Sequence, residues 1–177
     1  MHIPQLKLDL QDDQWPLDYI DHDRQIARAI VVDNEGDFYF MRVERWDEFA
    51  EGALMETSGG GVEPGEDLHT AILRELKEEL GATAEILGKI GVVSDYYNLI
   101  HRHNINHYFL CRAISFGEKN MTQEETEQFH LSTWKVTYEE ALQAYEDCSA
   151  TKLGKLLAAR EVPVLRQAKA MLEEISL

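Results

Sequence analysis

The sequence predicts an α+β fold, in which a mixed central sheet carries one helix on the sheet and further helices near the C-terminus. Two observations support this class. Strand-like apolar segments lie on both sides of residues 68–80, which have the clearest helical periodicity in the chain. Helical patterns then return at residues 138–145 and 152–175. Because the order is strands, helix, strands and helices, it predicts an α/β/α sandwich and not a repeating βαβ chain.

The first 24 residues are predicted to form an N-terminal extension or an edge strand, and residues 25–177 to form a single domain. In the extension, Leu6, Leu8 and Leu10 alternate with polar residues, as in a strand with one buried face. The segments expected to follow are two strands over 25–33 and 38–43, a polar loop over 44–53, a short strand over 54–57 and a glycine-rich turn over 58–61.

The predicted helix over residues 68–80 follows a candidate capping residue, Asp67 or Thr70, and ends at Gly81. Ile72, Leu76 and Leu80 repeat every four residues and form its apolar stripe. After the helix we expect strands over 86–97 and 105–116 joined by a loop over 98–104, an acidic loop over 117–130, a strand over 132–137 and C-terminal helices from about residue 151, with a break or kink at Pro163.

The composition narrows the class of ligand. The chain has 177 residues, 33 acidic and 17 basic, and a formal net charge of −16 at pH 7. A hydrophobic share of 44% is typical of a globular protein. The acidic balance argues against binding to nucleic-acid polymers and to anionic membranes. A phosphate-bearing ligand would therefore need a source of positive charge other than the overall balance.

The sequence also predicts a cytoplasmic setting. No apolar run is long enough to cross a membrane, and the N-terminal residues lack the pattern of a signal peptide. Cys111 and Cys148 are the two cysteines, and their contexts do not suggest a disulfide scaffold.

A second stripe on the predicted helix consists of carboxylates. Glu75, Glu78 and Glu79 stand at i, i+3 and i+4, so they share one side of the helix and repel one another. A solvated acidic face is the common explanation of such a stripe. A hard divalent cation offers another, because Mg²⁺ binds carboxylate oxygens together with substrate phosphate.

The spacing around these glutamates decides between the two explanations. The chain reads Gly60, five residues, Glu66, seven residues, Arg74-Glu75-Leu76, one residue, Glu78-Glu79, one residue, Gly81. This pattern resembles the signature of the Nudix hydrolases, a MutT-like family, and is highly specific. Two positions depart from the family pattern: Ala82 is small where an aliphatic residue is usual, and Ser58 stands where many members have proline.

The resemblance implies a role for each residue of the motif. Glu78 and Glu79 match the metal-binding pair, Glu75 matches a metal ligand or the base that orients water, and Arg74 matches the arginine that positions this glutamate. Gly60, Glu66 and Gly81 match structural positions. The carbonyl of Gly59 is expected to bind metal, and many members add a carboxylate before the last strand, for which Glu124 or Glu125 is favoured here.

The implied activity is metal-assisted attack of water on a diphosphate, with Mg²⁺ or Mn²⁺ as cofactor. The substrate is a small nucleotide derivative, in which a nucleoside diphosphate is linked to another group. Tyr96 and Tyr97 are candidates to stack on its base, and Arg42 and Arg102 to bind its phosphates, although ordinary packing and surface positions explain them as well. A zinc site formed by His101, His103 and His107 is a weaker interpretation.

Two rival functions share the expected fold. The first is a catalytically silent module that binds nucleotides, which usually loses motif carboxylates, whereas all three are present here. The second is a diphosphate isomerase, for which Cys111 is a poor candidate acid or base. Nucleotide sugars, ADP-ribose, dinucleoside polyphosphates and oxidised nucleoside triphosphates all remain open as substrates. The C-terminal segment is expected to pack on the domain, with a homodimer contact as the alternative.

Overall fold

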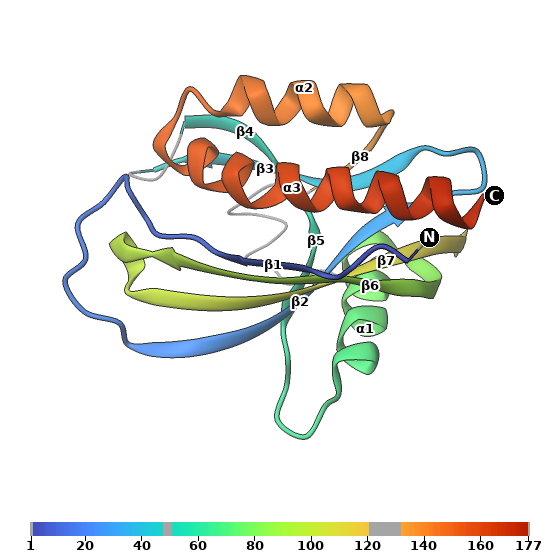
Figure 1. Ribbon diagram of the computed structural model, residues 1–177, viewed down its shortest axis with the longest axis horizontal. Helices are drawn as coiled ribbons and strands as arrows, with labels where there is room; N and C mark the ends of the chain where they lie inside the picture. The colour runs from blue at the N-terminus through green and yellow to red at the C-terminus, as the bar shows by residue number, and fades with distance from the viewer. Residues whose placement is uncertain (1, 48–50, 121–131, 177) are drawn as a thin grey trace.

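The computed structural model describes residues 2–47, 51–120 and 132–176, and within them an α+β sandwich (Figure 1). Its strands form one mixed sheet in the order β1-β6-β7-β2-β3-β4, with β5 paired to β2 and β8 paired to β3. The strands are β1 (Leu6–Asp9), β2 (His22–Val32), β3 (Phe38–Trp46), β4 (Glu51–Glu56), β5 (Ser58–Gly61), β6 (Ala82–Tyr97), β7 (Arg102–Phe116) and β8 (Ser132–Val136). The helices are α1 (Leu68–Leu80), the 3₁₀ turn η1 (Asn98–Ile100), α2 (Tyr138–Cys148) and α3 (Lys152–Ile175).

Helices cover the sheet on both sides, as Figure 1 shows for α1 below it and for α2 and α3 above it. Strand β2 serves both layers, because successive side chains of a strand point to opposite faces. Ala29 and Val31 pack in the core beside α1, whereas Ile30 and Val32 pack in the core beside α2 and α3. The predicted sandwich is therefore confirmed, and it places α1 alone on one face.

Helix α1 has the bounds that the sequence predicts. The Asp67 carboxylate accepts a hydrogen bond from the Thr70 backbone N–H at 2.7 Å, which caps the first turn. At the other end Gly81 takes a left-handed conformation with φ 67°. A Cβ at this position would lie 2.2 Å from the carbonyl oxygen of Gly117, so glycine is required for the close approach of the two segments.

Strand β1 confirms the predicted edge strand, since it pairs parallel to β6 from Leu6 opposite Gly91 to Asp9 opposite Ser94. The predicted loops at 44–53 and 98–104 are too long. Strand β3 continues to Trp46, β4 begins at Glu51, and β7 begins at Arg102. Pairing with neighbouring strands keeps the polar residues at these strand ends in regular β structure. A prediction from apolar residues does not detect such strand ends.

The predicted glycine-rich turn at 58–61 is strand β5, which pairs antiparallel to β2. The pairing sets Gly59 opposite Arg28, and a Cβ on Gly59 would lie 2.1 Å from the carbonyl oxygen of Ala27. Glycine therefore serves here to bring two backbones together, and it does not mark a flexible turn.

Of the two expectations at Pro163, the break is wrong, because α3 runs without interruption from Lys152 to Ile175, and the kink stays a prediction. Proline removes one helical hydrogen bond. The buried face of the helix, including Val164, Leu165 and Ala168, packs into the core around this position and holds the helix together. Among the helices described, none is long and apolar enough to span a bilayer.

Candidate active site

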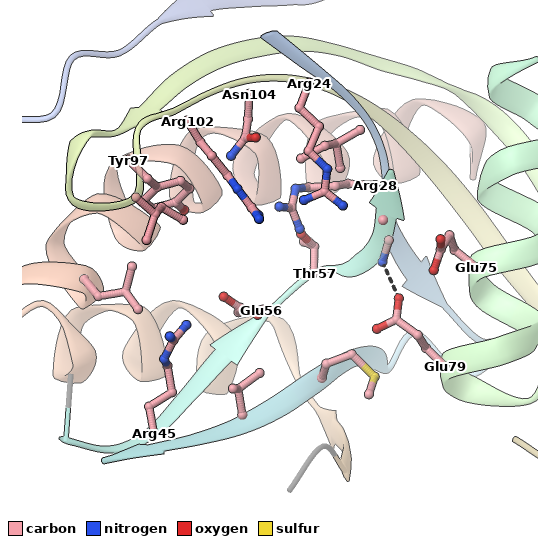
Figure 2. Close-up of a pocket in the computed structure, with 17 residues that line it drawn as sticks. Arg24, Arg28, Arg45, Glu56, Thr57, Glu75, Glu79, Tyr97, Arg102 and Asn104 are labelled. Carbon is pink, nitrogen blue, oxygen red and sulfur yellow. Dashed lines mark hydrogen bonds between the residues drawn. The ribbon is translucent and has the colours of Figure 1, made fainter. Parts of the chain in front are cut away.

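A cavity of about 540 Å³ opens between β2, β3, β5, β7 and helix α1. Figure 2 shows carboxylates of α1 at one end of this cavity and several guanidinium groups along its wall. Its charged and amide side chains are Arg24, Arg28, Arg45, Glu56, Glu75, Glu79, Arg102 and Asn104. The cavity thus has an acidic end and a basic wall, although the chain as a whole is strongly acidic.

The three helix glutamates differ in exposure. Glu79 is buried, and its Oε1 accepts a hydrogen bond from the Gly59 backbone N–H at 2.9 Å. Glu75 is also largely buried and lines the cavity with Glu79, whereas the side chain of Glu78 is 38% exposed. Strand β5 therefore comes directly against the acidic end of the cavity and fixes one of its carboxylates.

Arg74 joins the loop before α1 to the helix carboxylates. Its Nε and Nη2 donate to the two oxygens of Glu66 at 2.7 and 2.9 Å, which is a bidentate contact. Its Nη1 donates to Glu75 at 2.9 Å and to Glu78 at 3.3 Å. Arg74 thereby holds the Glu75 carboxylate in one orientation while Glu66 holds the guanidinium.

The contact between Glu66 and Arg74 predicts a pH dependence of stability. The hydrogen bond from Arg74 and that from the Glu63 backbone lower the pKa of Glu66 from 4.5 to about 2. A carboxyl whose folded pKa is depressed stabilises the fold above its unfolded pKa, and this contribution disappears as the pH falls through the folded pKa. We expect Glu66→Gln to lower the midpoint of thermal unfolding at pH 7, and the difference from wild type to shrink between about pH 4.5 and pH 2. Equal differences at both ends of that window, measured by circular dichroism, would contradict the assignment.

Gly60 leaves room for the Glu75 carboxylate. A Cβ on Gly60 would lie 2.5 Å from Glu75 Oε1 and 2.7 Å from its Cδ, which is closer than such atoms approach. The obstructed group is the end of a flexible side chain, so the side chain would move and the backbone would not. Gly60 thus acts on the position of a carboxylate more than on the fold.

The resemblance implies that Glu75 is a metal ligand or a base. We therefore expect Gly60→Ala to reduce turnover by about 10-fold or more, through displacement of this carboxylate, while the unfolding midpoint stays close to wild type. Gly117→Ala is the matched control, since the nearest atoms to its added Cβ lie 3.9 Å away. A fully active Gly60→Ala enzyme would show that the position of Glu75 does not matter.

Three arginines from β2 and β7 extend into the same part of the cavity (Figure 2). Within the described residues, Arg24, Arg28 and Arg102 form no ion pair with a carboxylate. Burial lowers the pKa of Arg24, and the neighbouring charges of Arg102 and Arg28 lower it further. A group of like charges held together at a cost in free energy favours an anionic ligand.

Asn104 adds a polar group to the basic wall. It is buried, it lines the cavity, and its Oδ1 has no hydrogen-bond partner among the residues that the structure describes. A buried acceptor of this kind is costly unless it is satisfied, and a ligand hydroxyl or amino group in the cavity would satisfy it.

The structure separates the residues that the sequence suggested for substrate binding. Tyr97 and Arg102 line the cavity, but Arg42 and Tyr96 do not. Arg42 pairs with Glu44 and lies 5.5 Å from the ring of Trp134 on the other face of β3. Tyr96 stacks on His103 with the ring centroids 4.3 Å apart.

Arg42 and Tyr96 lie outside the cavity lining because side chains alternate along a strand. Met41 and Val43 face the cavity, so Arg42 between them faces away, and the same holds for Tyr96 beside Tyr97. The histidines are engaged separately: His103 contacts Asp23 and Ser94, and His107 contacts Gln25. Glu124 and Glu125 lie outside the described residues.

Several cavity residues were missed by sequence reasoning, above all Arg24, Arg28, Asn104 and Glu56. One signal could have found the first two. Arg24 and Arg28 each lie two residues from Ile26, so the two arginines share one face of the strand with this buried apolar residue. Charged residues repeated on one face of a buried strand need a polar space to point into.

A separate acidic group lies in the turn between β2 and β3. Among the described residues, Asp33, Glu35 and Asp37 are the three acidic side chains that each place an oxygen within 4.8 Å of the others. Lys135 Nζ lies between 3.6 and 4.0 Å from all three. The turn is thus already supplied with a positive charge. Among the described residues, the α1 glutamates do not place three oxygens this close together.

The fold is an α/β/α sandwich with this glutamate-bearing helix at one end of an arginine-lined cavity. The NUDIX domain profile matches residues 23–155, and the chain therefore belongs to the NUDIX family. This agrees with the resemblance found in residues 60–81.

The sequence and the structure are also similar to those of known proteins. The chain is 31% identical over 118 residues to a protein of Bacillus subtilis (strain 168) named ADP-ribose pyrophosphatase, a match that covers 67% of this chain and 60% of that protein. The structure is similar to that of a NUDIX hydrolase from Nitrosomonas europaea, with a TM-score of 0.64, 13% identity, and 84% and 90% of the two chains covered. A MutT NUDIX hydrolase from Burkholderia pseudomallei gives a TM-score of 0.52 at 23% identity, with 67% and 86% covered. At these identities the solved structures support the fold alone.

Proposed function

We propose that this protein is a metal-dependent hydrolase that cleaves the diphosphate linkage of a nucleoside diphosphate joined to another group. The observation that carries this proposal is the cavity itself, in which the carboxylates of Glu75 and Glu79 face the same space as three arginines that form no ion pair within the described part of the chain. Membership of the NUDIX family supports it. The match covers only part of the Bacillus subtilis relative, so activity is assigned to this chain as a proposal.

The proposed cofactor is Mg²⁺, with Mn²⁺ as a substitute, in a family that generally uses a divalent metal. The residues present fit such an ion, because carboxylate and carbonyl oxygens are the ligands that both metals prefer. Glu75, Glu78, Glu79 and the carbonyl of Gly59 form the proposed ligand set, and the missing side chain of Gly60 leaves space beside Glu75. When bound, the ion lowers the pKa of its water and stabilises the leaving phosphate.

The other roles follow from the contacts around the cavity. Glu75 is proposed to accept a proton from the attacking water, in the orientation that Arg74 imposes through its contact at 2.9 Å. Arg24, Arg28 and Arg102 are proposed to bind the negative charge of the phosphates. The chain is acidic overall, so a phosphate-bearing ligand needs a local source of positive charge. These guanidinium groups of the cavity lining are proposed to supply it.

ADP-ribose is the first substrate to test, because the Bacillus subtilis relative carries that name. Tyr97 offers an aromatic ring in the cavity, and the orphaned Oδ1 of Asn104 would accept a hydrogen bond from a sugar hydroxyl or a base amino group. We further propose a cytoplasmic setting, in which the free thiols of Cys111 and Cys148 stay reduced.

A substrate panel tests this proposal. ADP-ribose, a nucleotide sugar, a dinucleoside polyphosphate and an oxidised nucleoside triphosphate are each incubated with the protein and Mg²⁺, and the products are separated by chromatography. We expect release of a nucleoside monophosphate from at least one compound. Tight binding of a compound without turnover of any would instead support the silent binding module.

A further inference from the structure

A chain of buried polar groups connects helix α3 to the basic wall of the cavity. Arg160 on α3 donates from Nη1 to Asp95 Oδ2 at 3.1 Å. The other oxygen of Asp95 accepts from Asn106 Nδ2 at 2.7 Å, and Asn106 Oδ1 accepts from Arg28 Nε at 2.8 Å. Three hydrogen bonds therefore lead from a helix on one face of the sheet to a guanidinium in the cavity.

A second branch of the same network reaches two further cavity residues. Arg160 Nη1 also donates to the hydroxyl of Tyr97 at 2.8 Å, and Arg160 Nη2 donates to Glu161 Oε1 at 2.8 Å. The same Glu161 oxygen accepts from Thr57 Oγ1 at 2.8 Å. Arg28, Tyr97 and Thr57 all line the cavity, while neither Arg160 nor Glu161 does.

The burial of this network makes it unusual as a purely stabilising device. The side chains of Arg160 and Glu161 are 1% and 0% exposed, and that of Asp95 is 6% exposed. Buried ion pairs contribute little net stability, because desolvation offsets the attraction between the charges, and apolar residues of similar size often do as well. Such a network fixes the orientation of its side chains, because a buried polar group that loses its hydrogen-bond partner is costly.

We propose that Arg160 is a positioning residue of the cavity: it holds the Tyr97 hydroxyl directly, and the Arg28 guanidinium through Asp95 and Asn106. Substrate affinity then depends on a helix residue that never touches the substrate. Arginine suits this position because its planar group donates in several directions at once, toward Asp95 and Tyr97 on one side and Glu161 on the other. The kinetic part of the proposal rests on the function proposed above, and the positional part does not.

The direct test observes Arg28 without any ligand. In wild type, the hydrogen bond to Asn106 should give Arg28 a slowly exchanging Nε–Hε signal in the side-chain region of a ¹⁵N NMR spectrum. We expect Arg160→Met to remove or broaden this signal, and Arg166→Met to leave it unchanged, because Arg166 is an exposed residue of the same helix. An unaltered Arg28 signal in a folded Arg160→Met protein would overturn the proposal whether or not the protein is an enzyme.

The kinetic test uses ADP-ribose, or the compound of the panel that turns over fastest. Arg160→Met should raise KM by about 10-fold, as expected for the loss of a hydrogen bond to a charged group, with a much smaller change in kcat. In an Arg28→Met background the same substitution should raise KM by a smaller factor than in wild type, because only the direct contact with Tyr97 remains to be lost. Independent, multiplicative effects would contradict the proposed path through Asp95 and Asn106.

A second variant covers the case in which Arg160→Met does not fold. Asp95→Asn has nearly the same shape and replaces the charged link between Arg160 and Asn106 by a neutral one. It should also disturb the Arg28 Nε–Hε signal and raise KM by several-fold. If Asp95→Asn folds and both readouts match wild type, the network has no positioning role.

Discussion

Replacing Glu78 by glutamine is expected to lower kcat by about 100-fold or more, because it removes one charged oxygen from the ligand set proposed to bind the metal. The fold should survive. The Glu78 side chain is 38% exposed and accepts a hydrogen bond from Arg74 at 3.3 Å, which a glutamine oxygen can still accept. Loss of one negative charge also relieves repulsion among Glu75, Glu78 and Glu79 on the same side of α1.

The measurement is kcat at saturating Mg²⁺ for the best substrate of the panel, together with the midpoint of thermal unfolding. Glu85→Gln is the matched control, since Glu85 is half-exposed, pairs with Arg112 at 3.2 Å and lies outside the cavity lining. The control should keep wild-type turnover. A Glu78→Gln protein whose turnover lies within about threefold of wild type would remove Glu78 from the catalytic machinery.

Local sequence patterns predicted much of the fold because those parts depend on local chemistry. Helix α1 has an apolar stripe, the capping residue Asp67 and a required glycine at position 81, and all three signals act over a few residues. Strands β2, β7 and β8 were likewise found from apolar or aromatic runs, and the edge strand β1 was found from the alternation of its leucines.

The errors arose where a distant segment decides the local structure. Gly59 and its neighbours are a strand only because β2 supplies the hydrogen-bonding partner. Helix α3 continues through Pro163 because packing against the core holds both sides of the proline. Neither influence is visible in a short window of sequence.

The candidate site likewise has a part that local sequence predicted and a part that depends on distant segments. The α1 glutamates and Arg74 were found because the motif fixes their spacing within one helix. Arg102 was among the sequence candidates, but Arg24 and Arg28 were missed, because they lie on β2 and meet Arg102 only when β2 and β7 pair in parallel. The buried link from Arg160 to Arg28 crosses four elements and has no local signature.

The overall charge of −16 is therefore a poor guide to the charge that a ligand meets. Inside the cavity, Arg24, Arg28 and Arg102 provide a local positive field, and solvent screens much of the acidity on the outer surface. An anionic nucleotide and an acidic protein are compatible because electrostatic attraction is strongest over short distances in a partly enclosed space.

Removal of divalent metal tests the central claim most directly. The initial rate of ADP-ribose hydrolysis, or of the best substrate in the panel, is measured with Mg²⁺, after addition of excess EDTA, and after Mg²⁺ is restored in excess over the chelator. We expect hydrolysis to fall to background in EDTA and to return in full with Mg²⁺, because the α1 carboxylates repel an anionic substrate unless a cation is bound between them. Undiminished hydrolysis in EDTA would contradict the assignment of Glu75, Glu78 and Glu79 as metal ligands.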